Sequence, residues 1–246
     1  MTEIRPSAMP RPVTALLGFV AGCVDGVTFL GLFGIFVAQL TGSYVLAGTN
    51  FVQSEHGLTV KLLAIPVFFL AGCIATAVAA VARLHGWRAL PCVMGLECAL
   101  LSAFTAIVLL RALPGIDASA VRSAALLGLA AMGVQSAMVR LLMHSPASTN
   151  VMTTNSTQIA IDCTLLLVKS VSKSGAHPFR EAASSGERLS GALPVVAAFL
   201  FGTVFGASAF SLVGFKAVLV PLAVTYLLLM WMILRPSDLT ASPLSC

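Results

Sequence analysis

The chain has 246 residues, of which 58% are apolar and only 9% are charged, and its mean hydropathy is +0.99. A soluble domain carries about 25% charged residues, so this chain has too little charge to cover a water-facing surface, and most of its surface must face lipid. The net charge of +5 comes from fourteen Lys and Arg residues that form no dense run, which excludes a nucleic-acid-binding patch and indicates a topology bias.

Six stretches are long and apolar enough to cross a bilayer, since a helix needs roughly 20 apolar residues to do so. The first is too long for the core of a signal peptide, and we expect it to be retained. The sequence therefore predicts an all-α, polytopic transmembrane helix bundle with about six spans. They cover residues 13–32, 61–82, 90–111, 121–143, 190–212 and 214–234.

Two further segments, 33–50 and 146–168, are shorter or more polar, and each follows a long span without a charged loop. Both are rich in Thr, Ser, Asn and Gly. This composition is typical of broken or re-entrant helices, because backbone that leaves a helix at membrane depth must be buried in protein or line a cavity. Marginal full crossings are the alternative, so the number of crossings is six or eight.

Basic residues predict the orientation of the chain but not the number of crossings. The hydrophilic loop 170–189 carries several Lys and Arg residues and is expected to be cytoplasmic. With six or with eight crossings, the N-terminal tail (1–12) and the C-terminal tail (235–246) then lie on the cytoplasmic side.

The two polar segments occupy matching places in two halves of the chain, 13–112 and 113–234. Thr41 follows Asp25 by 16 residues, and Thr153 follows Gln135 by 18 residues. Each half then continues with two long spans, which predicts a two-fold internal repeat. Three crossings per unit make the repeats inverted, as in many secondary transporters, whereas four crossings make them parallel.

The stretches GFVAGCVDGVTFLGLFGIFVAQLTGSYVLAG and GLAAMGVQSAMVRLLMHSPASTNVMTTNSTQIAIDCTLLL resemble the YoaK-like family of bacterial integral membrane proteins, a domain of unknown function. The resemblance extends over about residues 13–234 and rests on two motifs. The first is an Asp in the first span followed by a T-G-N, and the second is a T-G-N leading into T-Q-x-A-x-D. It implies a polytopic protein of the bacterial inner membrane and no particular chemistry. The chain departs from the motifs, which read Thr41, Gly42 and Ser43 in the first half and Thr153, Thr154 and Asn155 in the second.

Asp25 is the first candidate for a functional side chain inside the membrane. An ionisable group at bilayer depth costs at least ~2.5–3.5 kcal/mol, so something must offset that cost. Asp25 lies beside a stripe formed by Gly18, Gly22 and Gly26, where another helix is expected to approach closely. It should therefore face the bundle, either as a functional acid or as a structural hydrogen-bonding group.

Four other polar residues are candidates on similar grounds. Gln135 occupies the position of Asp25 in the second half but cannot titrate. Asp162 lies one turn after Gln158 and either functions in a site or pairs with a basic group near the cytoplasmic surface. Glu97 is surrounded by apolar residues in the third span, where an ion pair with Arg140 is the alternative to a functional role.

Motifs for enzyme chemistry are missing from the sequence. We find no Walker A loop, dinucleotide-binding fingerprint, H-E-x-x-H or G-x-S-x-G, and the six cysteines have no zinc-site spacing. We therefore expect no enzyme activity, no cofactor and no metal.

The polar landmarks predict a small secondary transporter or permease whose substrate site is formed by the two Thr-rich segments, with Asp25 and Asp162 or Glu97 binding a proton or an ion. The alternative is a non-transporting scaffold or regulatory membrane protein whose buried acids are structural. Expected partners are membrane lipid and a small solute or proton, and assembly as a homo-oligomer stays open.

Overall fold

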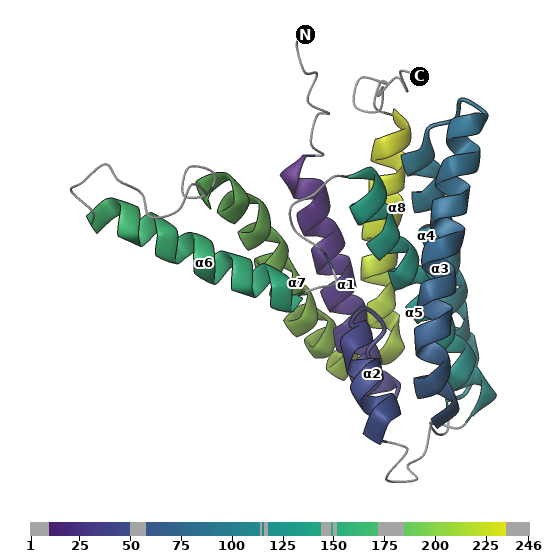
Figure 1. The fold of residues 1–246 in the computed structure, drawn as a ribbon. Helices are drawn as coiled ribbons and strands as arrows, with labels where there is room; N and C mark the ends of the chain where they lie inside the picture. The colour runs from purple at the N-terminus through teal and green to yellow at the C-terminus, as the bar shows by residue number, and fades with distance from the viewer. Residues whose placement is uncertain are drawn as a thin grey trace.

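The computed structural model describes residues 10–49, 58–113, 115, 118–143, 149, 152–171 and 185–234. Every regular element in these ranges is a helix, which confirms the predicted all-α class. The elements are α1 (Arg11–Gly31), α2 (Leu40–Thr49), α3 (Leu58–Leu84), α4 (Ala89–Leu110), α5 (Ser119–Leu142), α6 (Met152–Val171), α7 (Ser185–Val213), the 3-10 helix η2 (Gly214–Val218) and α8 (Leu219–Leu234) (Figure 1).

A sharp break follows the first helix. Phe33 and Gly34 have φ angles of 58° and 83°, which a right-handed helix cannot accommodate. The chain is then non-helical up to residue 39. α2 has 10 residues, a length of roughly 15 Å, which is half of the ~30 Å hydrocarbon core. The segment 33–50 is therefore a broken helix, and α2 is too short to cross a membrane alone.

Helices α3, α4 and α5 run up and down beside one another, because the connections between them are short (Figure 1). α7 and α8 also run in opposite directions, and η2 turns the chain between them with Gly214 at a φ of 62°. Pro66 interrupts the hydrogen-bond ladder of α3, and Pro194 does the same in α7.

Within the described residues, five candidate membrane spans are long and apolar enough to cross a bilayer. They are Arg11–Gly31, Val60–Leu84, Ala89–Leu110, Ser119–Leu142 and Ser185–Leu234. The last is 50 residues long and contains α7, η2 and α8. Two of the six predicted spans, 190–212 and 214–234, therefore fall within one candidate.

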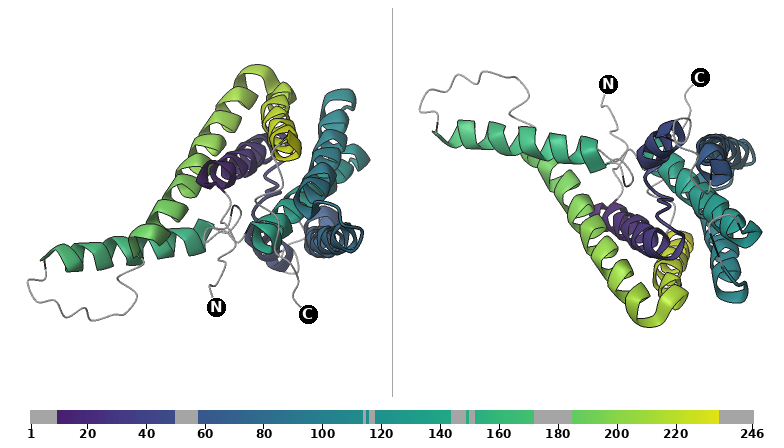
Figure 2. Two further views of the ribbon diagram at one scale, coloured as in Figure 1. Left: turned by 90° about the horizontal axis from the view of Figure 1, so that it is seen from above. Right: turned by 90° about the horizontal axis from the view of Figure 1, so that it is seen from below.

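The second polar segment contains the helix that extends furthest from the bundle. α6 is 20 residues long and is not among the five candidate spans. Among the described elements it packs only against α7. α6 and the first part of α7 diverge from the rest of the molecule, whereas the remainder of α7 packs on α1 (Figures 1 and 2). Residues 144–148, 150 and 151 of this region lie outside the described residues.

The predicted loop 170–189 is shorter than expected, because α6 continues to Val171 and α7 already begins at Ser185. The amphipathic ends of these helices carry polar residues that composition alone assigned to the loop. Residues 172–184 and the tails 1–9 and 235–246 lie outside the described part of the chain.

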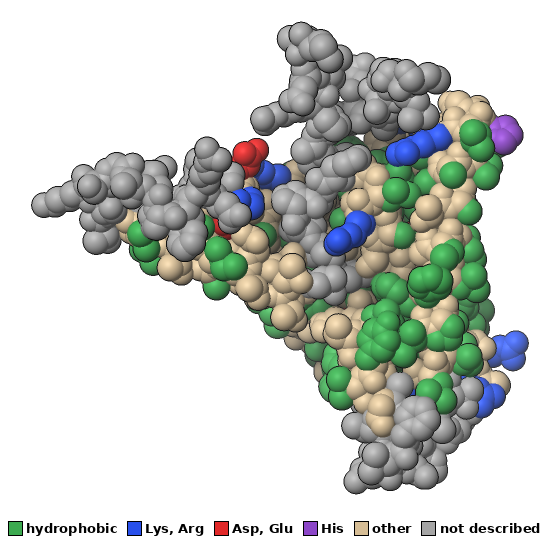
Figure 3. Space-filling view, viewed as in Figure 1, with side chains coloured by type: hydrophobic (Ala, Val, Ile, Leu, Met, Phe, Trp, Pro, Cys, Tyr) green, Lys and Arg blue, Asp and Glu red, His purple; other side chains and the backbone are tan. Residues whose placement is uncertain are grey.

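Three apolar clusters form the core of the described residues, and two of them are large. One surrounds α1, α4, α5 and the segment after α1, and the other lies among α3, α4, α5 and α8. Large apolar side chains also cover the outward faces of the long helices, as seen over α3 in Figure 3. An outer surface of this kind fits lipid better than water.

Candidate functional site

Asp25 is hydrogen-bonded to the broken segment that follows its own helix. Its side chain is buried, which confirms that it faces the bundle. Its Oδ1 accepts hydrogen bonds from the backbone N–H groups of Val37 at 2.9 Å and Ala38 at 2.7 Å. Buried N–H groups outside a helix cost free energy unless they are paired, and a carboxylate also suits the positive N-terminal end of α2. Asp25 therefore stabilises the break.

The second carboxyl oxygen of Asp25 is in a different situation. Oδ2 is buried and has no hydrogen-bond partner in the described part of the chain. The Gln39 side chain lies close to the carboxyl group. Oδ1 thus has a structural role, whereas Oδ2 can accept a hydrogen bond from a further donor.

Gln135 plays the corresponding part on α5. Its side chain is fully buried, and Nε2 donates to the backbone oxygen of Leu17 at 3.1 Å and to Oγ1 of Thr149 at 3.2 Å. Its Oε1 is buried without a hydrogen-bond partner among the described residues. Gln135 therefore connects α5 to α1 and to the chain ahead of α6.

The two anchored positions match along the sequence. Val37 lies four residues before Thr41, and Thr149 lies four residues before Thr153. In each half, a buried polar side chain on the first long helix binds the chain just ahead of a Thr-containing helix. Asp25 and Gln135 were predicted from the sequence, but Thr149 was not. The one sequence feature that could have indicated Thr149 is its position four residues before Thr153, which matches the position of Val37 before Thr41.

The two halves of the chain also contact each other close to the anchors. A Cβ atom on Gly128 of α5 would lie 3.1 Å from Cγ1 of Val37. Gln135 in turn reaches Leu17, the residue next to Gly18 on α1. Gly18 and Gly128 each lie seven residues before their anchor. Both contacts join the two halves close to the anchors, the first through the anchored segment and the second through the anchor side chain itself.

The glycine stripe of α1 packs against α7. A Cβ atom on Gly26 would lie 2.6 Å from the backbone oxygen of Thr203, and Cβ atoms on Gly22, Gly202 and Gly206 would also overlap with the backbone of the facing helix. Only glycine permits this approach. The predicted close helix contact beside Asp25 is thus confirmed, and the partner is α7.

The two Thr-rich groups are not in contact with each other, because α2 and α6 do not pack together in the described structure. In the first group Thr41 is exposed, Gly42 is partly buried and Ser43 is buried; in the second Thr153 and Thr154 are exposed and Asn155 is buried. A shared substrate site at these groups stays a prediction.

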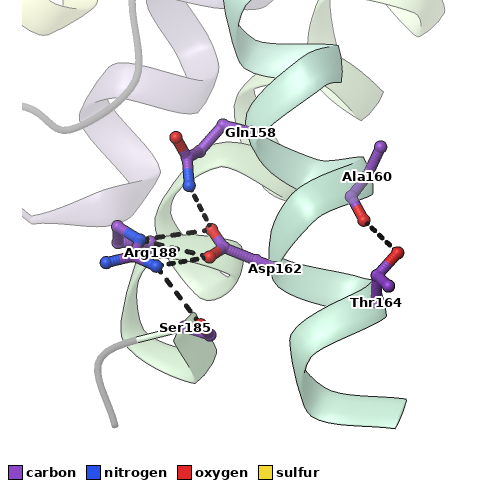
Figure 4. Close-up of polar contacts among 6 residues, drawn as sticks. All are labelled: Gln158, Ala160, Asp162, Thr164, Ser185 and Arg188. Atoms are coloured by element: carbon purple, nitrogen blue, oxygen red, sulfur yellow. Dashed lines mark hydrogen bonds and ion pairs between the residues drawn. The ribbon is translucent and has the colours of Figure 1, made fainter. Parts of the chain in front are cut away.

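Asp162 forms the most extensive polar network, which joins α6 to the start of α7 (Figure 4). Its Oδ1 lies 2.7 Å from an Arg188 guanidinium nitrogen, and its Oδ2 accepts a hydrogen bond from Gln158 at 2.9 Å. Arg188 also donates to Ser185 Oγ at 3.2 Å. Asp162 therefore pairs with a basic group, which was one of its two predicted roles, and that group is Arg188.

This network determines the protonation of Asp162. Burial raises the pKa of the carboxyl group, but hydrogen bonds from Arg188, Gln158 and Ser185, together with the Arg188 charge, outweigh that effect. The pKa of Asp162 therefore lies below its ordinary value, and the group is an anion at neutral pH.

Glu97 has no comparable support. Its side chain on α4 is fully buried, and neither carboxyl oxygen has a hydrogen-bond partner in the described residues. The suggested ion pair with Arg140 is not formed, because Arg140 is exposed near the end of α5. Among the residues described, the His, Cys, Asp and Glu side chains form no group that could bind a metal ion.

These features define a helical membrane protein with polar anchors inside its bundle. Residues 13–231 match the family described as protein of unknown function (DUF1275), and the chain belongs to this family. No curated protein and no solved structure matches the chain.

Proposed function

We propose that the protein is a small secondary transporter or permease built from two inverted repeats, 13–112 and 113–234. The observation that carries the proposal is the pair of anchors at matched positions, Asp25 and Gln135, each bound to the chain ahead of a Thr-containing helix. In many secondary transporters, discontinuous segments from two such repeats form the substrate site near the membrane midplane.

The arrangement of helices supports an inverted repeat. α1 and α5, the first long helices of the two halves, run in opposite directions, and so do α3 and α7 (Figure 1). α1 packs on α7 as α5 packs on α3. The third helix of each half also contains a proline near its start, Pro66 in α3 and Pro194 in α7.

This assignment implies six crossings by α1, α3, α4, α5, α7 and α8. An even number agrees with the start of α1 and the end of α8 lying at the same end of the bundle (Figure 1). The excess of Lys and Arg favours a cytoplasmic location for that end, and the resemblance to the YoaK-like family favours the bacterial inner membrane.

Transport in such a protein requires the site to open alternately to each side. The glycine contact joins α1 to α7, whereas α3, α4 and α5 pack as a second group. A rocking motion between these groups would act on the anchored positions Val37, Ala38 and Thr149. Asp25 and Gln135 are both buried here, so this conformation is closed to water around the anchors.

The test is an uptake screen with purified protein in liposomes, comparing the wild type with Asp25→Asn. Asparagine keeps an acceptor oxygen for Val37 and Ala38 but removes the charge, so we expect a folded protein with altered flux of a solute or proton. Glu187→Gln is the matched control, because it removes an exposed carboxylate at the start of α7. A wild type without flux for any solute tested would contradict the proposal.

The second candidate is a non-transporting scaffold or regulatory membrane protein, without enzyme activity. The observation that favours it is the structural use of Asp25 Oδ1 in a closely packed region. In that case Asp25→Asn should reduce folding yield and leave no flux phenotype. Lipid is a partner under both proposals, and a homo-oligomer is compatible with both.

A further inference from the structure

Glu97 is the buried acid for which the fold gives no structural explanation. Asp25 binds backbone N–H groups and Asp162 binds Arg188, so both stabilise the structure that buries them. Glu97 is 0% exposed and both its oxygens lack a hydrogen-bond partner in the described chain. A buried carboxyl group without a partner destabilises a fold. Its presence at this position therefore points to a role other than stability.

The position of Glu97 is central in the bundle. It lies one turn from Met94, which packs in the cluster containing Met138, and one turn from Leu101, which packs in the cluster containing Leu129. Since α4 and α5 are antiparallel neighbours, Glu97 lies at a level similar to that of Gln135. The Gln135 Oε1, also buried and unpartnered, is an acceptor for a proton donor at this level.

The surrounding helices supply no charge to balance Glu97. Cys98 is its neighbour on α4, and the Tyr226 hydroxyl of α8 is within 3.0 Å of the Ser102 hydroxyl. The remaining charged or titratable residues on the elements that pack against α4 form no described bond with Glu97. They are Lys61, Cys73 and Arg83 on α3, Arg122 and Arg140 on α5, and Lys216 on η2.

We propose that Glu97 is a proton-binding site on α4 inside the bundle, at a level similar to that of Gln135. Uptake forms an O–H bond on the carboxylate with a proton from water on one side, and release breaks that bond and returns the proton to water. Directional release on the opposite side rests on the proposed transport function, whereas proton binding itself does not. In this proposal Glu97 binds the proton, and Asp25 stabilises the segment ahead of α2.

Infrared spectroscopy of the purified protein at a series of pH values tests proton binding directly. We expect a carbonyl band of a protonated carboxylic acid that changes intensity with pH, is retained in Asp25→Asn and is missing in Glu97→Gln. A wild-type band that is unchanged by Glu97→Gln, or no pH-dependent band, would overturn the proposal.

Stability measurements on Glu97 variants test whether Glu97 has a purely structural role. Because no partner is lost, Glu97→Gln and Glu97→Leu should fold with thermal midpoints equal to or above that of the wild type. If both variants instead lose stability or fail to fold, Glu97 is a structural residue and the proposal is wrong. If the band behaves as expected but the wild type carries no flux in liposomes, the transport function fails and the proton site stands.

Discussion

At the residue scale, the four buried polar residues proposed from the sequence differ in their bonding partners. The sequence alone could not show these differences. Asp25 and Gln135 bind chain segments, Asp162 forms an ion pair, and Glu97 has no described partner. The cost of burying each group is offset by different bonds, and those bonds join residues far apart in the sequence. Burial could be predicted from the apolar context of each residue, but the partner could not.

The Asp162 network predicts a pH dependence of the contact between α6 and α7. The pKa of Asp162 is lowered in the folded protein, so its stabilisation is present above the unfolded value of about 3.9 and is lost as the pH falls through the folded value. We expect hydrogen exchange in α6 to increase below about pH 4.

Asp162→Asn should weaken the same contact at neutral pH by about 1–3 kcal/mol, because hydrogen bonds to a charged group are lost. Hydrogen exchange measured by mass spectrometry checks both effects, with exchange in α4 as the internal reference. Equal protection of α6 in the variant and the wild type at neutral pH would show that Arg188 does not stabilise this contact.

At the element scale, close backbone approach determines how the helices associate. α1 and α7 approach closely through glycines on both helices, where the backbone of one helix lies against the glycines of the other. Lipid is as apolar as the side chains that would otherwise mediate the contact, so close packing replaces the hydrophobic effect as the source of association. The sequence predicts the stripe on α1 from the spacing of its glycines, but the facing helix lies about 180 residues away and is identified only by the fold.

Gly22→Ala should destabilise the protein by about 1–3 kcal/mol, because the added Cβ overlaps with the backbone of α7. Gly95→Ala on α4 is the matched control, since a Cβ there meets nothing within 4 Å. That variant should be neutral or stabilised by up to ~1 kcal/mol through helix propensity. Thermal unfolding in detergent measures both, and equal midpoints for the two variants would contradict the close contact.

At the scale of the whole molecule, the proposed inverted repeat depends on the sidedness of the connections. With six crossings, the turn between α3 and α4 is cytoplasmic and the turn between α4 and α5 is external. With eight crossings these two turns exchange sides.

Single cysteines on a cysteine-free background distinguish the two arrangements. His85→Cys should react with an impermeant maleimide only from the cytoplasmic side, and Gly115→Cys only from the external side. Intact and inverted membrane vesicles provide the two sides. Labelling of Gly115→Cys from the cytoplasm would contradict six crossings and the inverted repeat together.

The sequence by itself determined the all-helical membrane class and the placement of the long apolar helices, because these follow from local composition and helix length. It predicted a break after α1 but left a full crossing as the alternative. Only the tertiary structure decided that Asp25 binds the segment ahead of α2, that α6 packs on α7 alone, and that Glu97 is left without a described partner. The physical reason is that hydrogen bonds and close helix contacts depend on which distant segments meet. Hydropathy indicates how strongly a residue prefers to be buried, but it does not indicate which residues it contacts once buried.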